Sequence, residues 1–180
     1  MAAAMDRFAA LVAKLDPQHW DQPTPCVGWS VFDVVDHVVA GDRLTAITLD
    51  GASVEVASGA ANGLDTENPH LEEQVADAAA VALQAFEGSL DRIIDHRVGP
   101  VPARRVLGFR IIDQLGHTWD VATATGVPVV LDSDALAVGV DIAVAERATL
   151  ERSPNFATLP ESEPSGVPLA VFLRSIGRVG

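Results

Sequence analysis

Hydrophobic residues recur at helical spacing in four long segments of the chain, which Pro and Gly residues separate. The segments cover residues 2–15, 31–49, 71–95 and 104–125. The third has the longest apolar stripe, at positions 71, 75, 78, 79, 82, 83, 86, 90, 93 and 94, which is typical of a helix with one buried face. A fifth helix is expected from residue 132 or 133 to residue 150. Amphipathic helices of this length predict an all-α fold built on a four-helix bundle.

Local signals mark several ends of these segments. Ser30 is typical of a helix N-cap, and Asp33 follows in the first turn, where the helix dipole favours an acidic residue. Gly126 is expected to end the fourth helix. Residues 50–69 contain several Gly residues and predict either a long loop or a loop with a short helix. Residues 127–131 are the one β-prone run, so we expect no sheet of more than two short strands.

The C-terminal part of the chain has a different character. Residues 153–167 are rich in Pro and Ser and are expected to be irregular, whereas residues 168–177 predict a short terminal helix. We therefore expect a helical-bundle domain over residues 1–152. An extension over residues 153–180 should follow it, with the short helix packed on the bundle.

The chain is strongly acidic, with 12 Lys and Arg against 25 Asp and Glu, a net charge of −13 and a pI near 4.5. This charge repels phosphate groups, so we expect neither a nucleic-acid partner nor binding to an anionic membrane. No apolar run approaches the roughly 20 residues that span a bilayer, and the N-terminus does not resemble a signal peptide. Cys26 is the single cysteine, so no internal disulfide can form and a reducing, cytoplasmic setting is expected.

Two of the five histidines, His37 and His117, fall inside predicted helices. On an ideal helix Asp113, His117 and Asp120 lie within about 60° of one another, and the apolar residues cluster on the opposite side. Asp113 and His117 are four residues apart, so their side chains are close enough to bind one ion together. The alternative is a solvated acidic face that happens to contain a histidine.

His37 lies at the edge of the apolar face of its own helix, which by itself favours a hydrogen-bonded core histidine. Together with Asp113 and His117 it makes a possible site of two imidazoles and one carboxylate between two facing helices. Three protein ligands leave coordination positions open, as in catalytic metal sites. Trp29 and Trp119 are expected to anchor the core, and either could also wall a pocket.

Cys26 stands in a loop bounded by Pro residues. A small buried residue is expected there, rather than a nucleophile or a fourth metal ligand. Three arginines, Arg104, Arg105 and Arg110, gather near the start of the fourth helix. They could bind a substrate carboxylate, although Arg110 could equally pair with Asp113.

Three stretches of the sequence, over residues 20–41, 108–113 and 116–126, form a recognisable combination. The first contains the pattern W-x-x-P-T-P-C-x-x-W-S-V-x-D-x-x-x-H, and the third reads H-x-W-D-x-A-x-A-T-G. This combination resembles the mycothiol-dependent maleylpyruvate isomerase N-terminal family, within the DinB-like superfamily. The resemblance covers about residues 5–150.

The resemblance implies a four-helix bundle with a divalent metal between its helices, usually zinc or nickel. By position, the ligands that it implies are His37, Asp113 and His117, and Asp120 becomes a residue that supports the ligands without binding the ion. The chain has Asp113 where the characterised isomerase has a Glu. Only about 30 residues follow Leu150, too few for the C-terminal domain of that enzyme. The resemblance therefore implies related thiol chemistry rather than maleylpyruvate isomerisation itself.

The leading hypothesis is a metal-dependent protein of the mycothiol-dependent isomerase or S-transferase type. Its divalent ion, zinc first and nickel or iron as alternatives, would activate mycothiol or a similar small thiol for attack on an electrophilic small molecule. The alternative is a non-catalytic bundle that binds a metal or a thiol, as a sensor or as a partner of another enzyme. A metal-dependent hydrolase with Asp120 as general base ranks third. The resemblance also implies an actinobacterial source and a possible homodimer.

Overall fold

The computed structural model describes residues 1–152 and 166–178 of the chain. These residues contain eight α-helices, one 3-10 helix and one two-stranded hairpin. In chain order the elements are α1 (Ala2–Val12), η1 (Pro17–His19), α2 (Val31–Leu49), α3 (Val54–Ala60), α4 (Leu71–Phe86), β1 (Ile93–Ile94), β2 (Val101–Pro102), α5 (Ala103–Thr125), α6 (Ser133–Ala145), α7 (Arg147–Leu150) and α8 (Pro168–Ser175).

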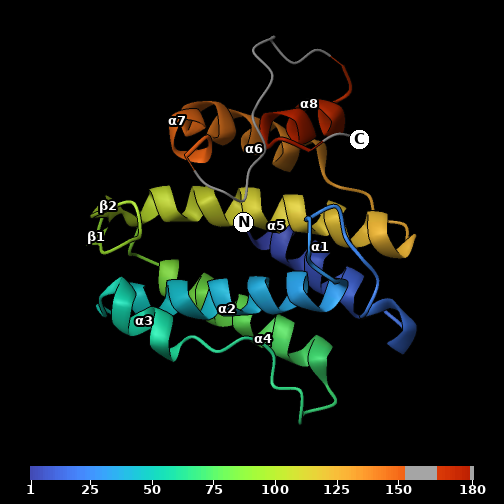
Figure 1. The fold of residues 1–180 in the computed structure, drawn as a ribbon. Helices are drawn as coiled ribbons and strands as arrows, with labels where there is room; N and C mark the ends of the chain where they lie inside the picture. Colours follow the sequence, from blue (N-terminus) through green and yellow to red (C-terminus); the bar gives the residue numbers. More distant parts are fainter. Residues whose placement is uncertain (153–165, 179–180) are drawn as a thin grey trace.

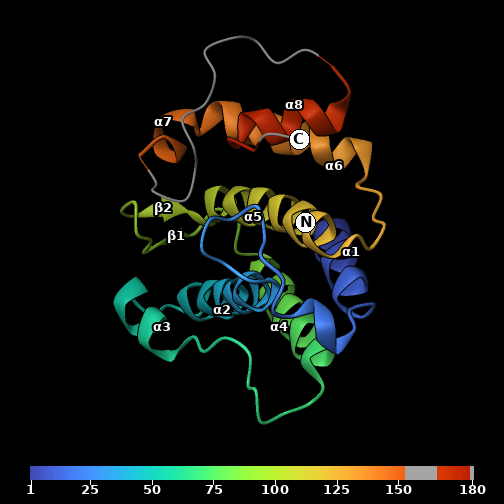
Figure 2. The same cartoon turned by 45° about the vertical axis from the view of Figure 1, so that its right-hand side comes forward.

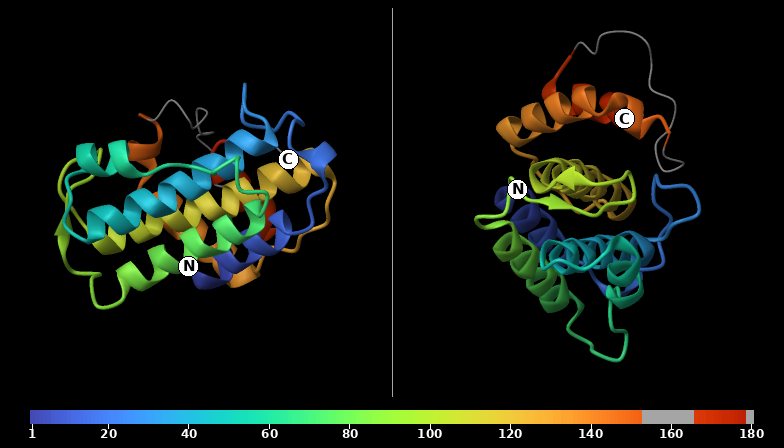
Figure 3. Two further views of the ribbon diagram at one scale, coloured as in Figure 1. Left: turned by 90° about the horizontal axis from the view of Figure 1, so that it is seen from below. Right: turned by 90° about the vertical axis from the view of Figure 1, so that its left-hand side faces the viewer.

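The long helix α5 lies in the middle of three helical layers (Figures 1 and 3). On one side it is covered by α1 and α2, which both also pack against α4. These four helices close into a ring of neighbours, which is the predicted four-helix bundle. On the other side α5 packs against α6, and α6 packs against α8. The all-α fold expected from the sequence is therefore confirmed, with an additional helical layer on one face of the bundle.

Hydrophobic cores lie on both sides of α5. The core between α1, α2, α4 and α5 consists of the aromatic Phe8 and of buried aliphatic residues, which include Leu11, Val31, Val34, Val35, Val38, Val75 and Val121. The core between α5, α6 and α8 includes Ile111, Ile112, Leu115, Leu136, Phe172, Leu173 and Ile176. Because both faces of α5 are covered, most polar residues in its middle are also buried, among them Arg110, His117 and Asp120. This burial creates the site described below.

The predicted capping signals are confirmed. Ser30 caps α2, since its hydroxyl accepts from the Asp33 amide at 3.2 Å and the Asp33 carboxylate accepts from the Ser30 amide at 2.8 Å. Such a reciprocal pair satisfies two amides that the first turn leaves open. Gly126 ends α5 in the left-handed conformation, and the Asp132 side chain caps α6. Helix α1 ends at Val12, before the predicted residue 15.

The helix predicted over residues 71–95 is wrong over its last part, residues 87–95. Helix α4 ends at Phe86, and Gly88 follows with a φ of 70°, a conformation that residues with a Cβ adopt at a cost. Ile93 is 65% exposed and Ile94 4% exposed, and both belong to strand β1. Their alternation has the period of a strand, so counting both as part of a helical stripe was the error.

Three other regions differ from or refine the expectation. The fifth helix is interrupted at Glu146, which separates α6 from α7 and pairs with Arg105. Residues 50–69 contain the short helix α3, the second of the two alternatives. Residues 127–131 form no strand, and the one sheet among the described residues is the antiparallel pair of β1 and β2.

The described part of the C-terminus contains α8, which agrees with the short terminal helix expected over residues 168–177. The irregular segment expected over residues 153–167 lies almost entirely outside the described residues. The division into a bundle over residues 1–152 and an extension over residues 153–180 stays a prediction. Among the described helices, none combines the length and the apolarity that crossing a membrane requires.

Candidate metal centre

His37 on α2 and the pair Asp113 and His117 on α5 converge on one point. Asp113 Oδ1 lies 3.4 Å from His37 Nε2 and 3.3 Å from His117 Nε2. One possible ligand atom from each of the three residues lies within 4.8 Å of the other two. The structure thus brings together the three residues expected from the sequence, whereas their role as metal ligands stays a prediction.

The solvated-face alternative for this part of α5 is wrong. His117 is 6% exposed and Asp120 is completely buried, while the Asp113 side chain retains 21% exposure. The helix is enclosed here because α2 and the loop before it cover the polar side. Buried charges of this kind need partners, and each of the three residues has several.

Arg110 holds the other oxygen of Asp113. Its Nη1 donates to Asp113 Oδ2 at 2.6 Å, while its Nε and Nη2 donate to Asp42 Oδ1 at 3.0 and 2.7 Å. Gly41 on α2 makes room for this guanidinium, because a Cβ at that position would overlap it. The carboxylate of Asp113 is therefore fixed from behind, and its Oδ1 is left facing the two imidazoles.

The sequence-based idea of a carboxylate-binding arginine cluster is not supported for these three residues. Arg110 is 7% exposed and is engaged by Asp42 and Asp113. Arg105 forms a two-pronged pair with Glu146, and Arg104 pairs with Asp91. Arg110 instead pairs with Asp113, as the alternative interpretation of the sequence predicted.

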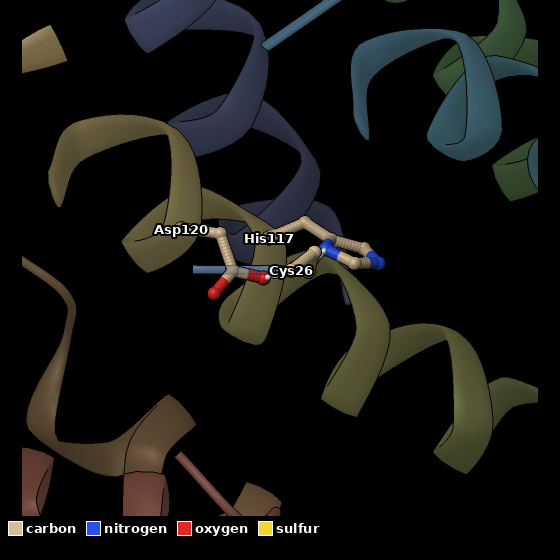
Figure 4. A group of neighbouring side chains, drawn as sticks. All are labelled: Cys26, His117 and Asp120. Atoms are coloured by element: carbon tan, nitrogen blue, oxygen red, sulfur yellow. Dashed lines mark hydrogen bonds and ion pairs between the residues drawn. The ribbon is translucent and has the colours of Figure 1, made fainter. Parts of the chain in front are cut away.

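Asp120 fixes the orientation of the His117 ring. His117 Nδ1 lies 2.9 Å from Asp120 Oδ2, so the proton on Nδ1 is donated to this carboxylate and the Nε2 edge is presented to His37 and Asp113. Figure 4 shows the Nδ1 edge of the ring turned toward Asp120 and the other nitrogen pointing away from it. Metal-binding histidines are commonly held by a carboxylate in this way. The role of Asp120 in supporting a metal ligand stays a prediction.

The site is strongly polarised. Burial alone would raise the pKa of Asp113, but the charges of His117, Arg110 and His37 outweigh it and hold this pKa well below 3.8. Burial alone would lower the pKa of His117, but the Asp113 charge and the hydrogen bonds to Asp113 and Asp120 hold it well above 6.5. Without a metal, the pair is therefore a carboxylate beside an imidazolium.

Cys26 is partly buried rather than fully buried, and it has polar neighbours that the prediction of a small buried residue did not include. Its Sγ lies 3.1 Å from Asp120 Oδ2 and 4.0 Å from His117 Nδ1. Cys26 reaches these residues because the loop before α2 folds back toward α5 (Figure 2). Backbone hydrogen bonds between Thr24 and Trp29 and between Gln22 and Val31 hold the loop in this shape.

Cys26, His117 and Asp120 form a second group with the spacing of metal ligands. Arg178 lies among them, with Nη2 3.0 Å from Asp120 Oδ2 and 3.3 Å from Cys26 Sγ. Because this guanidinium already supplies the positive charge there, we favour the cluster of His37, Asp113 and His117 as the metal site. Arg178 was missed from the sequence, where nothing linked it to the motifs some 60 residues upstream.

Trp29 lies against both histidines, with ring centroids 5.0 Å from His37 and 6.2 Å from His117. Trp29 thus forms an aromatic wall beside the site, which agrees with the second of its two expected roles, core anchor or pocket wall. Trp119 packs instead in the core between α5, α6 and α8. The Trp29 ring shields the two imidazoles from water on one side, which strengthens electrostatic interactions among them.

A cavity of about 650 Å³ lies beside the cluster, and two of the three cluster residues, His37 and Asp113, belong to its lining. His37, Arg110 and Asp113 form one part of its lining, and Arg97 and Arg152 belong to another. Two imidazole nitrogens and one carboxylate oxygen suit Zn²⁺, Ni²⁺ or Fe²⁺. Three protein ligands would leave coordination positions for a small molecule, and the cavity offers the space for one.

Comparisons with known proteins agree with these features. Residues 1–122 match the family described as "Mycothiol maleylpyruvate isomerase N-terminal domain". The chain is 32% identical over 178 residues to the uncharacterized protein Rv0738 of Mycobacterium tuberculosis (strain ATCC 25618 / H37Rv), covering 94% of this chain and 92% of that protein. It is 28% identical over 142 residues to the uncharacterized protein Rv0036c of the same strain, covering 71% of this chain and 55% of that protein. No solved structure matches it significantly.

The family match spans more than half of the chain and includes His37, Asp113, His117 and Asp120. It also agrees with the DinB-like helical bundle and with the motifs at Cys26 and at the end of α5. The chain therefore belongs to the mycothiol maleylpyruvate isomerase N-terminal domain family.

Proposed function

We propose that this protein binds a divalent metal through His37, Asp113 and His117 and uses it to activate a small thiol for attack on an electrophilic molecule. The family points to mycothiol as that thiol. The observation that carries the proposal is the convergence of two imidazole Nε2 atoms and one carboxylate oxygen beside a cavity of about 650 Å³. A divalent ion in such a site lowers the pKa of a bound thiol and favours the nucleophilic thiolate.

The surrounding residues have distinct tasks in this proposal. Asp120 holds His117 so that its Nε2 is available, and Arg110 holds Asp113 so that only one of its oxygens faces the imidazoles. Trp29 keeps water from one side of the two rings. A site whose ligands are fixed in advance needs little rearrangement when it binds its ion.

The cavity favours an electrophile that carries a carboxylate or a similar anionic group. Among the described residues that line it, Asp113 is the only acid, whereas Arg97 and Arg152 are two exposed arginines. Neither arginine has an ion-pair partner in the described part of the chain. In a chain with a net charge of −13, two such arginines at one cavity would create a local attraction for an anion.

A preference for anions is tested with a thiol-reactive carboxylic acid and its methyl ester as matched electrophiles. We expect the wild-type protein to prefer the acid, and we expect replacement of both Arg97 and Arg152 by Gln to remove that preference through KM. A control variant replaces Arg92, which is exposed and lies outside the cavity lining. Equal use of acid and ester by the wild type would contradict this part of the proposal.

The hydrolase hypothesis finds little support, because Asp120 is completely buried and is not part of the cavity lining. Its carboxylate is already engaged by His117 and Arg178. A general base must reach the proton that it removes. The alternative of a metal- or thiol-binding protein without catalysis uses the same cluster and cavity, and it differs only in the absence of turnover.

The central experiment measures metal content by elemental analysis and S-conjugation with a panel of electrophiles, in the same purified protein. We expect about one divalent ion per chain and turnover that depends on added mycothiol. His117→Ala should lose both, while His70→Ala, which alters an exposed histidine at the start of α4, should lose neither. Metal without turnover favours the binding-protein alternative, and a wild type that takes up no divalent ion refutes the proposal.

A further inference from the structure

We propose that Arg178, beyond the end of α8, is a positioning residue for the candidate metal site and that it acts through Asp120. This inference rests on the proposed metal site. Under this proposal the C-terminal segment, which comprises α8 and the turn to Arg178, helps to hold a metal ligand in place although it supplies no ligand itself. The relay runs from Arg178 to Asp120, and from Asp120 to the ring of His117.

The contacts of Arg178 are directed at both oxygens of one buried carboxylate. Its Nε lies 3.1 Å from Asp120 Oδ1, and its Nη2 lies 3.0 Å from Asp120 Oδ2. The Asp120 side chain has no exposure, and the Arg178 side chain has 12%. A two-pronged guanidinium contact fixes the plane of a carboxylate as well as its position. Oδ2, which also accepts from His117 Nδ1, is thereby held in place.

A tight turn at the end of α8 places Arg178 beside Asp120. Gly177 has a φ of 74°, its amide donates to the Arg174 carbonyl at 3.1 Å, and the Arg178 amide donates to the Leu173 carbonyl at 2.8 Å. These two bonds form a Schellman turn, which ends α8 and redirects the chain. The turn brings the arginine back toward α5.

Close packing holds α8 near α5 and α6. Phe172 and Ile176 are buried in the core that α8 shares with α5 and α6. A Cβ on Gly116 of α5 would lie 3.0 Å from Ile176 Cδ1, and one on Gly139 of α6 would lie 2.8 Å from the Phe172 ring. These glycines therefore permit an approach that other residues would hinder, and Arg178 reaches Asp120 from a rigid support.

A second segment also converges on Asp120. Cys26 from the loop before α2 donates to Oδ2 at 3.1 Å, and Arg178 Nη2 lies 3.3 Å from its sulfur. Asp120 thus joins the loop that precedes the His37 helix, the helix of His117 and the C-terminal segment. If the geometry of His117 depends on this junction, docking of α8 and metal binding must favour each other, because linkage between two equilibria is reciprocal.

The test measures Co²⁺ and Zn²⁺ affinity by competition with a chelator in the full-length protein. We expect Arg178→Gln to weaken binding about tenfold, as for other residues that orient metal ligands, and to alter the visible spectrum of bound Co²⁺. Arg178→Lys should recover only part of the loss, because an ammonium group cannot contact both oxygens in one plane. Arg92→Gln, a substitution at an exposed arginine, should leave affinity and spectrum unchanged.

A double-mutant cycle separates a relay through Asp120 from a general loss of structure. In the Asp120→Asn background, Arg178→Gln should cost little additional affinity, whereas independent effects would add. NMR of the metal-free protein gives a readout that needs no ion: the Nδ1 proton of His117 should exchange faster with water in Arg178→Gln. If wild type binds metal while Arg178→Gln binds equally well or the two effects add, the positioning role is overturned alone. If wild type binds no metal, both the proposed site and this inference fail.

Discussion

Arg110 binds one oxygen of Asp113 at 2.6 Å, and the other oxygen of Asp113 faces the Nε2 atoms of His37 and His117. The same guanidinium binds Asp42 on α2. One buried arginine therefore connects the two helices that carry the candidate ligands. Arg110 should therefore contribute both to the stability of the bundle and to the position of Asp113 in the site.

Replacing Arg110 with Met should destabilise the protein by about 3–5 kcal/mol, because it leaves Asp42 and Asp113 without their common counter-charge. Urea denaturation at neutral pH measures the free energy of unfolding. Adding Asp42→Leu to Arg110→Met should restore part of the loss, since it removes the acid whose ion pair was with Arg110, whereas Asp113 keeps its pair with His117. Arg92→Met should stay within about 0.5 kcal/mol of wild type, as is usual for exposed positions. A loss of similar size at both arginines would contradict the role of the pair.

Replacing Asp120 with Asn should weaken metal binding by about 10–100-fold without abolishing it. The neutral amide can still lie near His117 Nδ1, but it supplies no negative charge and no longer holds Arg178 as an ion pair. Chelator competition with Zn²⁺ gives the dissociation constants. Asp134→Asn alters an exposed acid in the first turn of α6 and serves as the matched control. An unchanged affinity in Asp120→Asn would show that the orientation of His117 does not depend on this carboxylate.

Metal binding at neutral pH should release a proton from His117. In the metal-free protein the pKa of His117 is raised well above 6.5, chiefly because Asp113 outweighs the effect of burial. A group with a raised pKa is still protonated near pH 7, and an imidazole must be neutral to coordinate. Affinity should therefore rise with pH until the solution pH exceeds this pKa. Calorimetry in buffers of different ionisation enthalpy counts the protons released, and a buffer-independent binding enthalpy would contradict the assignment.

The extent to which the sequence predicts the site depends on whether each contact is local. Asp113 and His117 are adjacent on any α-helix, and Ser30 and Asp33 form a capping box within one turn. Such features follow from spacing alone. Cys26 reaches Asp120 across 94 positions of the chain and Arg178 does so across 58, and no local pattern encodes either contact.

Helix burial was predicted less well than helix position. The pattern on α5 indicates one apolar face and one polar face, which led to the alternative of a solvated acidic surface. The structure covers both faces, so Asp120 is buried although it lies opposite the apolar stripe. Hydrophobic periodicity shows which face is apolar, but it does not show whether a second layer covers the polar one.

The break between α6 and α7 gives the last prediction, which concerns stability in acid. Glu146 accepts from Arg105 at 2.6 and 2.7 Å, and this hydrogen bonding lowers the pKa of Glu146 from its ordinary 4.5. A lowered acid pKa stabilises the folded state above the unfolded-state pKa, and that contribution is lost as the pH falls through the folded-state pKa. Glu146→Gln should therefore cost about 1 kcal/mol or less at pH 7, since both partners are partly exposed. Urea denaturation at several pH values should show that the difference in free energy of unfolding between Glu146→Gln and wild type shrinks below pH 4.5.

Glu87→Gln, at an exposed position after α4, controls for the general loss of one acid. If the difference between Glu146→Gln and wild type stays constant as the pH falls, the pair with Arg105 contributes nothing measurable to stability.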